Sequence, residues 1–159
     1  MNQKTRCLAV IRLRGPVGIG VEREYTFKLM HLARKHHAIL VEGTPSNAGS
    51  IQKIKDYATW GEVSIDAVSS LLAKRGRLEG GVKLTEEYVQ EPLGYSSIAE
   101  LSKSIYDLRV RMTDLPRVKP IFRLHPPRKG FHGSIKKPYP KGALGYRGEA
   151  INTLIAKMV

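Results

Sequence analysis

Basic and aromatic side chains are interleaved between Arg123 and Arg147, in a stretch that contains neither Asp nor Glu. Lys and Arg neutralise phosphates and release their counterions, which gives affinity for nucleic acid without base readout. Aromatic rings and arginine planes can in addition stack on unpaired bases. We therefore predict that nucleic acid is contacted by Arg123, His125, Arg128, Lys129, His132, Lys136, Lys137, Lys141 and Arg147.

A second set of basic residues lies in the first third of the chain, where the hydrophobic pattern is that of a folded body. Each of these side chains taken alone suits an ordinary solvated surface, but together they extend the basic face. Arg12 and Arg14 stand out because they share one face of a predicted strand, beside a glycine-rich loop. The candidates in this set are Arg12, Arg14, Arg23, Lys28, Lys53 and Lys55.

Catalytic and metal-binding arrangements gain little support from the residue pattern. A nuclease using His125 or His132 would need an acidic partner, and the surrounding stretch offers none. Cys7 is the single cysteine, so an internal disulfide and a cysteine-based zinc cluster are excluded. The loop from Gly15 to Gly20 matches neither glycine motif for nucleotides and is predicted to be a structural turn. We predict no catalytic residue, no metal and no cofactor.

The composition supports a folded, strongly basic protein. The chain has 159 residues, 42% of them hydrophobic, and 27 Lys and Arg against 14 Asp and Glu give a net charge of +13. A polyanion would relieve the self-repulsion of this charge, so nucleic acid is the first candidate partner and an anionic membrane surface the second. No apolar run reaches the length of a membrane span, no signal peptide is visible, and the single cysteine fits a reducing, cytoplasmic compartment.

The charge divides the chain into a body and an arm. Residues 117–148, called here the basic arm, hold nine of the basic residues, five Pro and five Gly, whereas residues 36–116 are nearly neutral. Proline and glycine at this density argue against long helices and a packed core. We expect a core in 1–64, an added helical region in 65–115, and the arm with a final helix in 116–159. We also expect residues 1–115 to fold alone and the arm to order only on RNA; a disordered, solvated tail is the alternative.

Hydrophobic periodicity and capping residues predict the elements of the body. Residues 1–64 are expected to contain strands at 7–14, 38–41 and 59–63, separated by helices at 22–35 and 48–57. Asp66 and Ser97 are expected to cap two further helices, and Glu100 stands in the capping-box position after Ser97. Residues 84–89 fit a strand or a short helix equally. A short strand at 121–124 and a helix at 149–158 complete the pattern.

The same residues resemble a known family over nearly the whole chain. The stretch from Leu8 to Gly15, the helix carrying Tyr25 to Leu32, and the segment from Trp60 to Glu62 are similar to the large-subunit ribosomal protein L-thirty family. Phe122 to Gly130, Leu144 to Gly148 and Ile151 to Ile155 resemble its longer archaeal branch.

The resemblance implies an α+β protein with a ferredoxin-like β-α-β-α-β core, an added helical region, and a basic C-terminal arm ending in a short helix. It implies a structural, non-enzymatic constituent of the large ribosomal subunit in the cytoplasm. The implied partners are large-subunit ribosomal RNA, with 5S rRNA as a candidate, and neighbouring ribosomal proteins, but neither a membrane nor a small-molecule substrate. The rival hypothesis is a free-standing RNA- or DNA-binding accessory protein.

Overall fold

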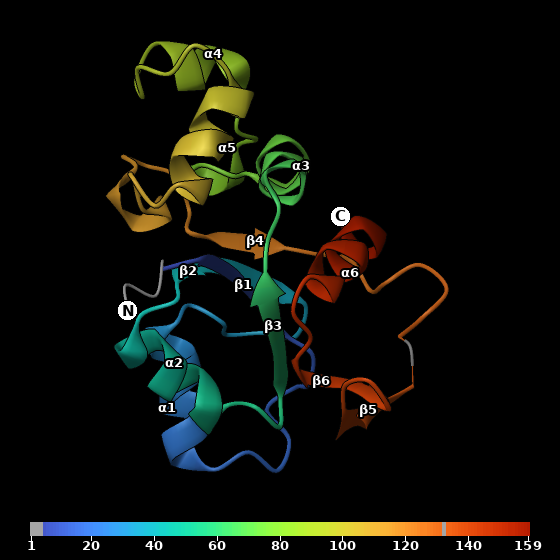
Figure 1. Cartoon of the computed structure of the whole chain (residues 1–159). Coiled ribbons are helices and arrows are strands. Elements are labelled where there is room, and N and C mark those ends of the chain that lie inside the picture. Colours follow the sequence, from blue (N-terminus) through green and yellow to red (C-terminus); the bar gives the residue numbers. More distant parts are fainter. Residues whose placement is uncertain (1–4, 132) are drawn as a thin grey trace.

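The computed structural model describes residues 5–131 and 133–159, and its first three strands form the centre of a mixed sheet (Figure 1). Strand β1 (Cys7–Arg12) pairs antiparallel with both β2 (His37–Glu42) and β3 (Ala58–Glu62). Helix α1 (Val21–Leu29) connects β1 to β2, and α2 (Pro45–Lys53) connects β2 to β3. The predicted ferredoxin-like core and the α+β class are therefore confirmed.

The central strand is apolar in continuous sequence because both of its faces are covered. Ala9 and Ile11 point into a core shared with the later helices, whereas Val10 points into a separate core with Phe27 of α1. Helices α1 and α2 lie on one side of the sheet, and α3 (Ile65–Arg75), α5 (Ile98–Tyr106) and α6 (Ala150–Met158) lie on the other (Figure 1). The sheet is thus the middle layer of three.

Three helix boundaries in the core differ from the sequence-based expectation: the end of α1 and both ends of α2, which ends at Lys53 rather than at residue 57. Helix α1 ends at Leu29 rather than near residue 35, and His31 and His36 adopt φ values of 60° and 67°, outside the helical region. Helix α2 begins at Pro45, earlier than expected, because the Thr44 hydroxyl accepts a hydrogen bond from the Asn47 amide at 3.3 Å. Proline at the first helical position needs no donor, which fits this early start.

The caps of the added helices are partly as predicted. Ser64, not Asp66, caps α3 by accepting a hydrogen bond from the Ala67 amide, and Asp66 lies in the first turn. Ser97 caps α5 as expected. The segment 84–89, for which a strand and a short helix fitted equally, forms helix α4 (Glu86–Gln90). One 3-10 turn precedes it at Glu79–Gly81, and another follows α5 at Met112–Asp114.

The basic arm joins the sheet, which corrects the expectation that it lacks a packed core. Strand β4 (Ile121–Arg123) pairs with β2, and β6 (Gly142–Tyr146) runs parallel to β3, with β5 (Ser134–Pro138) paired outside it. The final order is β4-β2-β1-β3-β6-β5. The open edges of β2 and β3 supply backbone partners that an isolated tail would lack. The expectation that the arm orders only on RNA is therefore wrong for these three strands.

The core beneath α3, α5 and α6 draws on all three predicted ranges. Phe122, Leu144 and Ile151 are at most 4% exposed and pack in the same cluster as Val63 and Leu71. The structure thus does not support the expectation that residues 1–115 fold alone. The predicted strand at 121–124 and final helix at 149–158 are confirmed within a residue. No helix in the described part of the chain is long and apolar enough to cross a membrane.

Candidate nucleic-acid interface

Arg12 is buried inside the core rather than displayed on a strand face. Its side chain is 0% exposed, and its guanidinium lies 4.0 Å from the centre of the Phe27 ring. Nη1 donates to the carbonyls of Leu32 and Ala33 at 2.8 and 3.2 Å, and Nη2 pairs with Glu24 at 3.2 Å. These bonds hold the chain that follows α1 against β1. The prediction that Arg12 contacts nucleic acid does not fit this burial, so Arg12 is not part of the candidate interface.

Arg14 and Arg23 each place a guanidinium group near the ring of Tyr57, although they come from different parts of the chain. Their guanidinium carbons lie 4.8 and 5.7 Å from the ring centre. Arg14 donates to the carbonyl of Asp56 at 3.2 Å, and Arg23 lies 3.9 Å from the Asp56 carboxylate. The ring attracts both cations, but the nearby Asp56 carboxylate offsets part of their charge.

The three predicted lysines of the body are exposed and separate from this pair. Lys28 lies in the last turn of α1, Lys53 ends α2, and Lys55 follows in the turn before β3. Lys53 approaches Glu22 at 3.7 Å, with both side chains more than half exposed. Such surface pairs contribute little, so Lys53 remains available to an external anion.

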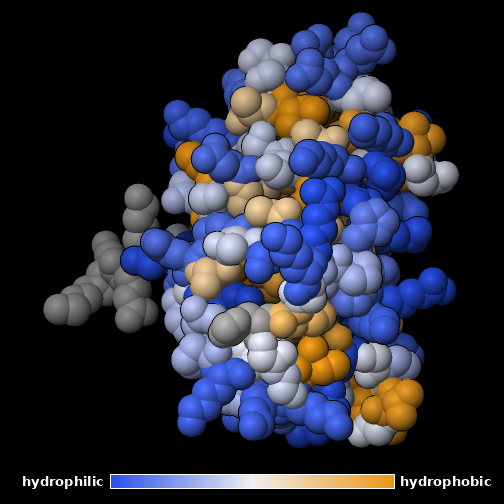
Figure 2. Space-filling model, turned by 90° about the vertical axis from the view of Figure 1, so that its right-hand side faces the viewer, coloured by the Kyte–Doolittle hydropathy of each residue, from blue (hydrophilic) through white to orange (hydrophobic). Residues whose placement is uncertain are grey.

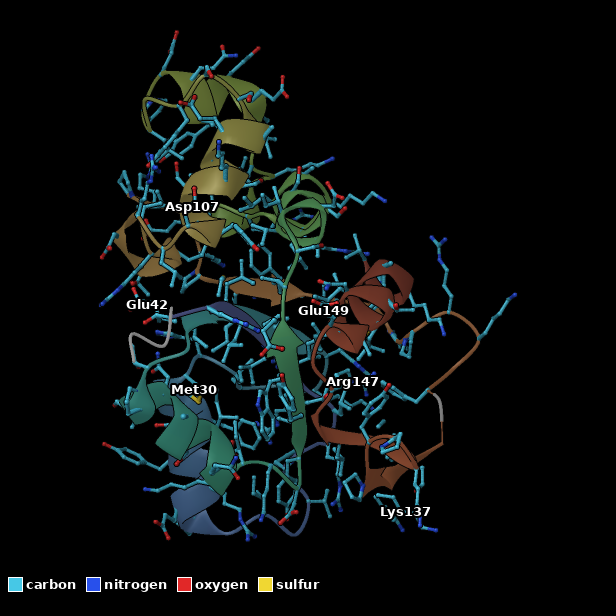
Figure 3. The ribbon with its side chains drawn as sticks, in the orientation of Figure 1. Met30, Glu42, Asp107, Lys137, Arg147 and Glu149 are labelled. Carbon is cyan, nitrogen blue, oxygen red and sulfur yellow. The ribbon has the colours of Figure 1, made fainter. Side chains whose placement is uncertain are left out.

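The outer edge strand presents lysines to solvent along its length. All five residues of β5 are exposed, including Lys136 and Lys137, and Lys141 is exposed in the turn before β6. Lys137 points away from the sheet at this edge (Figure 3). Lysine and proline on an edge strand also discourage pairing with another chain, which is the structural alternative to an RNA contact.

Arg147 acts mainly as a brace between strands. Its Nε donates to the Thr59 hydroxyl at 2.8 Å, and its guanidinium stacks on Tyr139 at 5.3 Å. Burial lowers the pKa of Arg147 from its usual value, because the charged form loses hydration. The half-buried side chain therefore joins β3, β6 and the turn between β5 and β6 (Figure 3).

The segment after β4 docks on the C-terminal turn of α6. The amide of His125 donates to the Met158 carbonyl at 3.0 Å, and the amide of Arg128 donates to the Lys157 carbonyl at 3.1 Å. These bonds satisfy helix-end carbonyls that otherwise lack partners. The side chains of His125, Arg128 and Lys129 are exposed from this fixed backbone. His132 falls outside the described residues.

Three basic residues that the sequence pattern did not single out join Arg123 and His125 around a cavity of about 370 Å³. They come from the end of α3, the following loop and the approach to β4, so their sequence separation concealed the grouping. They are Arg75, Arg77 and Lys119. The remaining lining residues are Gly81, Ile121 and Leu124, and none of the lining residues is acidic.

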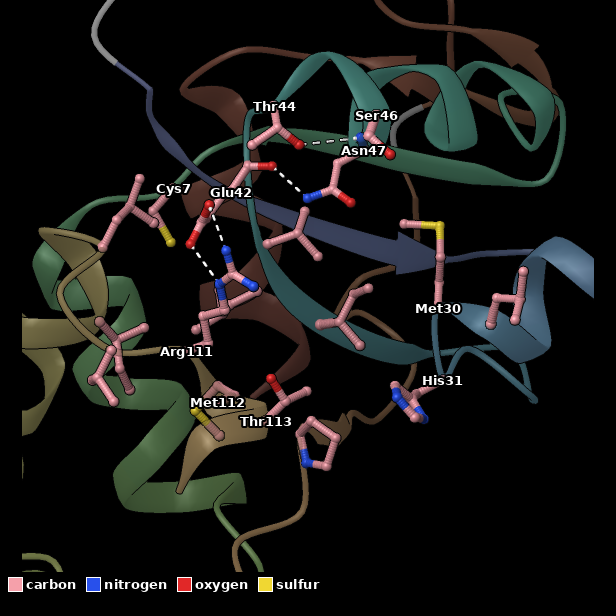
Figure 4. A pocket seen from close by; sticks show the side chains of 18 residues that line it. Cys7, Met30, His31, Glu42, Thr44, Ser46, Asn47, Arg111, Met112 and Thr113 are labelled. Atoms are coloured by element: carbon pink, nitrogen blue, oxygen red, sulfur yellow. Dashed lines mark hydrogen bonds and ion pairs between the residues drawn. The ribbon is translucent and has the colours of Figure 1, made fainter. Parts of the chain in front are cut away.

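A second cavity, of about 360 Å³, lies beside the part of β2 that β4 does not cover. Figure 4 shows its mixed lining, with Met30 and His31 on one side and Met112 and Thr113 on the other. Arg111 closes one end by pairing with Glu42 at 2.8 Å. The charge of Arg111 at this end of the cavity is neutralised by Glu42, so the cavity does not extend the basic surface.

The exposed cations of the arm lie on the face that carries α6, β6 and β5. Figure 2 shows this face: hydrophilic side chains cover most of it, and hydrophobic ones form separate patches. The arm contains no carboxylate of its own, and the Glu62 carboxylate that accepts from the Tyr146 hydroxyl comes from β3, so positive charge predominates over the arm. The arrangement offers fixed positive charges on rigid strands and turns, which suits a ridge of phosphates.

Comparison with known proteins agrees with this geometry. Residues 8–58 match the family described as ribosomal protein L30p/L7e. The chain is 49% identical to the large ribosomal subunit protein uL30 of Methanopyrus kandleri, covering 92% of this chain and 100% of that protein. It is 45% identical to the protein of the same name from Archaeoglobus fulgidus, over 94% and 98% of the two chains. The corresponding protein of Hyperthermus butylicus is 46% identical over 99% and 93%.

Proposed function

Because the chain belongs to the ribosomal protein L30p/L7e family, and is thereby a structural, non-enzymatic constituent of the large ribosomal subunit, we propose that its basic arm is the main contact to ribosomal RNA. Membership confirms the resemblance seen in the sequence, including its archaeal branch. It also sets aside the rival hypothesis of a free-standing nucleic-acid-binding factor. The subunit places the protein in the cytoplasm, bound to ribosomal RNA.

One observation carries the proposal: beyond the end of β4, the arm displays five exposed cations, and its sequence contains no carboxylate. Two follow β4, two lie on β5 and one precedes β6: Arg128, Lys129, Lys136, Lys137 and Lys141. Their backbone is held by the sheet and by α6, so little ordering entropy opposes binding. Lysine and arginine at fixed positions fit a phosphate backbone of matching shape better than a flexible tail would.

The body contributes a weaker contact in this proposal. Arg14 and Arg23, stacked on Tyr57, and the exposed Lys28, Lys53 and Lys55 form its cationic part. Their charge is diluted by Glu22 and Asp56, which lie within 4 Å of Lys53 and Arg23. We therefore expect these residues to tune affinity rather than to supply most of it.

Two further partners belong to the proposal as classes. Neighbouring large-subunit proteins are expected to cover exposed apolar side chains such as Val17, Val21 and Leu29, which are at least 63% exposed. 5S rRNA is a candidate for part of the RNA contact. Crosslinking in intact subunits, mapped to nucleotides and peptides, would show which RNA and which proteins lie beside the arm.

The direct test removes four arm cations together and leaves the fold intact. The variant carries Arg128→Ala, Lys129→Ala, Lys136→Ala and Lys137→Ala. Its affinity for large-subunit RNA should fall, and the slope of log affinity against log salt should become less steep by roughly 0.7 to 0.9 for each phosphate that is no longer neutralised. Unfolding stability should change by no more than about 0.5 kcal/mol per site, because these side chains are exposed.

The matched control removes the same charge elsewhere. Lys74, Lys83, Lys103 and Arg109 are exposed residues of the added helical region and are replaced with alanine. If the control loses as much affinity as the arm variant, binding depends on net charge alone and the arm proposal is wrong. Trypsin supplies a second readout, since the bonds after Arg128 and Lys136 should be protected in the assembled subunit.

A further inference from the structure

We infer that the cavity between the end of α3, the loop after it and β4 is a binding pocket for one phosphate group of the RNA backbone. The pocket is lined by Arg75, Arg77, Lys119 and Arg123, with His125 at its margin. This inference rests on the proposed RNA-binding function, but it concerns residues other than Arg128, Lys129, Lys136, Lys137 and Lys141. Its ligand chemistry is a phosphodiester.

The pocket concentrates positive charge that the protein itself does not neutralise. Three arginines and one lysine line it, and no acidic residue does. The ion pairs in the described part of the chain involve Arg6, Arg12, Arg23, Lys53 and Arg111, and thus none of the lining residues. Cations grouped in one concave site repel one another, so an anion bound there would be favoured.

Arg75 brings to the pocket a donor that the described residues leave unsatisfied. Its Nε is buried and finds no hydrogen-bond partner within the described residues. A buried donor without a partner costs free energy, and such groups in native proteins usually mark a bound water, ion or ligand. Arg77 uses Nη1 to donate to the Gly76 carbonyl at 3.0 Å, which leaves other donors of its guanidinium for a ligand.

The backbone around the pocket holds these side chains in fixed relative positions. The Lys119 amide donates to the Arg77 carbonyl at 2.9 Å, and the Leu78 amide donates to the Val82 carbonyl at 2.7 Å. Arg123 is fixed by the pairing of β4 with β2, opposite His37. A site whose cations are positioned before binding loses less entropy when the anion arrives.

A phosphodiester fits this lining better than a carboxylate side chain does. Arginine forks bind phosphate oxygens through two parallel hydrogen bonds, and a tetrahedral group can accept from several directions at once. Ile121 and Leu124 form an apolar part of the wall, where the sugar next to a phosphate can pack. The volume of about 370 Å³ falls in the roughly 300 to 1,000 Å³ range of ligand sites.

The first experiment uses the unmodified full-length chain, so it does not depend on a variant folding. Inorganic phosphate is titrated against a chloride series of equal ionic strength, and the Nε–Hε resonances of the arginines are followed by NMR. We expect a saturating shift of the Arg75 resonance with phosphate and not with chloride. The exposed Arg109 serves as the internal control. Equal, unsaturated shifts at both residues would overturn the inference.

The second experiment asks whether RNA uses the pocket. The double variant Arg75→Gln and Lys119→Gln is compared with Lys74→Gln and Lys83→Gln, which removes the same charge from exposed neighbours that do not line the cavity. Only the pocket variant should make the salt slope of RNA binding less steep, by about one. Competition by inorganic phosphate should weaken RNA binding by the wild type more than by the pocket variant.

The outcomes separate this inference from the proposed function. If the arm variant loses affinity while the pocket and control variants match each other, the phosphate pocket is wrong and the arm proposal stands. If the arm variant also binds like the wild type, the proposed role of the arm fails. The Arg75 resonance could saturate with phosphate while the pocket variant keeps the wild-type slope of log RNA affinity against log salt. That result would show that the pocket binds a free anion, and it would overturn the assignment to RNA.

Discussion

At the scale of single residues, the most instructive case is Arg12, whose charge is used within the protein. Its guanidinium binds the Leu32 and Ala33 carbonyls, which follow a helix that ends early, and it also pairs with Glu24. A buried cation of this kind is tolerated because its donors are satisfied and a ring faces its plane. The residue thus fixes the geometry of the connection from α1 to β2.

Replacing Arg12 should damage the fold rather than RNA contact. The Arg12→Ala change leaves three backbone carbonyls and part of the Glu24 carboxylate without partners. It should lower unfolding stability by about 3 to 5 kcal/mol, as for other broken buried pairs. Urea denaturation measures this loss. Arg14→Ala is the control, since Arg14 is only half-buried. Equal, small losses for both variants would contradict the structural role.

Two adjacent histidines make stability depend on pH. Burial, followed by the positive charge of Lys35, lowers the pKa of His36 from its ordinary 6.5. Burial, followed by Arg123, Arg34, Arg12 and His36, lowers the pKa of His37. The folded protein therefore holds both rings neutral below the pH at which the unfolded chain protonates them.

The sign of the pH effect follows from this difference. Stability should be fully present above pH 6.5 and should decrease as the pH falls through 6.5 toward the lower folded-state pKa values. Thermal melts between about pH 7.5 and 5.5, which bracket the titration of histidine, measure the effect. The variant His36→Gln and His37→Gln should show a flatter profile, whereas His31→Gln, at an exposed position, should not. A wild-type Tm that rises on acidification would contradict the assignment.

At the scale of elements, the closest packing occurs where β3 meets the start of α6. A Cβ at Gly61 would collide with the carbonyl of Gly148 and would lie 3.1 Å from the Cβ of Ile151. Only a residue without a side chain lets the two backbones approach this closely. Glycine here therefore reflects tertiary packing rather than a turn.

Two glycine-to-alanine changes should have opposite effects. Gly61→Ala should lower unfolding stability by about 1 to 3 kcal/mol, as overpacking does. Gly49→Ala lies in α2, where a Cβ would meet nothing within 4 Å, and should raise stability by about 0.5 to 1 kcal/mol. Chemical denaturation of both variants provides the measurement. A neutral Gly61→Ala would mean that α6 moves away from β3 without cost.

At the scale of the whole molecule, the arm is both a core component and a surface. Its apolar residues complete the sheet and the core beneath α6, and its cations remain outside. This division follows from the position of each segment, because the apolar residues lie on β4 and β6, whereas the exposed cations beyond β4 lie on the outer strand β5 and in the connecting segments. The proposed RNA-binding surface is therefore positioned by the same residues that stabilise the fold.

Removing the arm should consequently unfold the body. A chain ending at residue 115 would lack β4, β5, β6 and α6, and would expose the apolar surface that Phe122, Leu144 and Ile151 now cover. We expect it to lose cooperative thermal unfolding, followed by circular dichroism. A fragment that melts cooperatively near the Tm of the full chain would show that the body folds alone. The four-alanine arm variant is the control that keeps every strand.

Local features of the fold were predictable because their signals lie within a few residues of one another. The apolar run of β1, the cap at Ser97 and the helix after Glu149 follow from periodicity and capping alone. The acid-free arm was likewise visible in the composition. Helix ends were predicted less well, because Ser64 and Asp66 are both good caps and only the path of the chain selects between them.

The tertiary structure alone decided which charges face solvent. Arg12 is the last residue of an apolar strand, where an arginine is ordinarily expected to face solvent. It is buried only because α1 packs over β1. Arg75 and Arg77 are far in sequence from Lys119 and Arg123, and the pairing of the segment after α3 with the approach to β4 brings them around one cavity. Sequence periodicity records which side of an element is apolar, but burial depends on which elements meet, and those contacts form between distant segments.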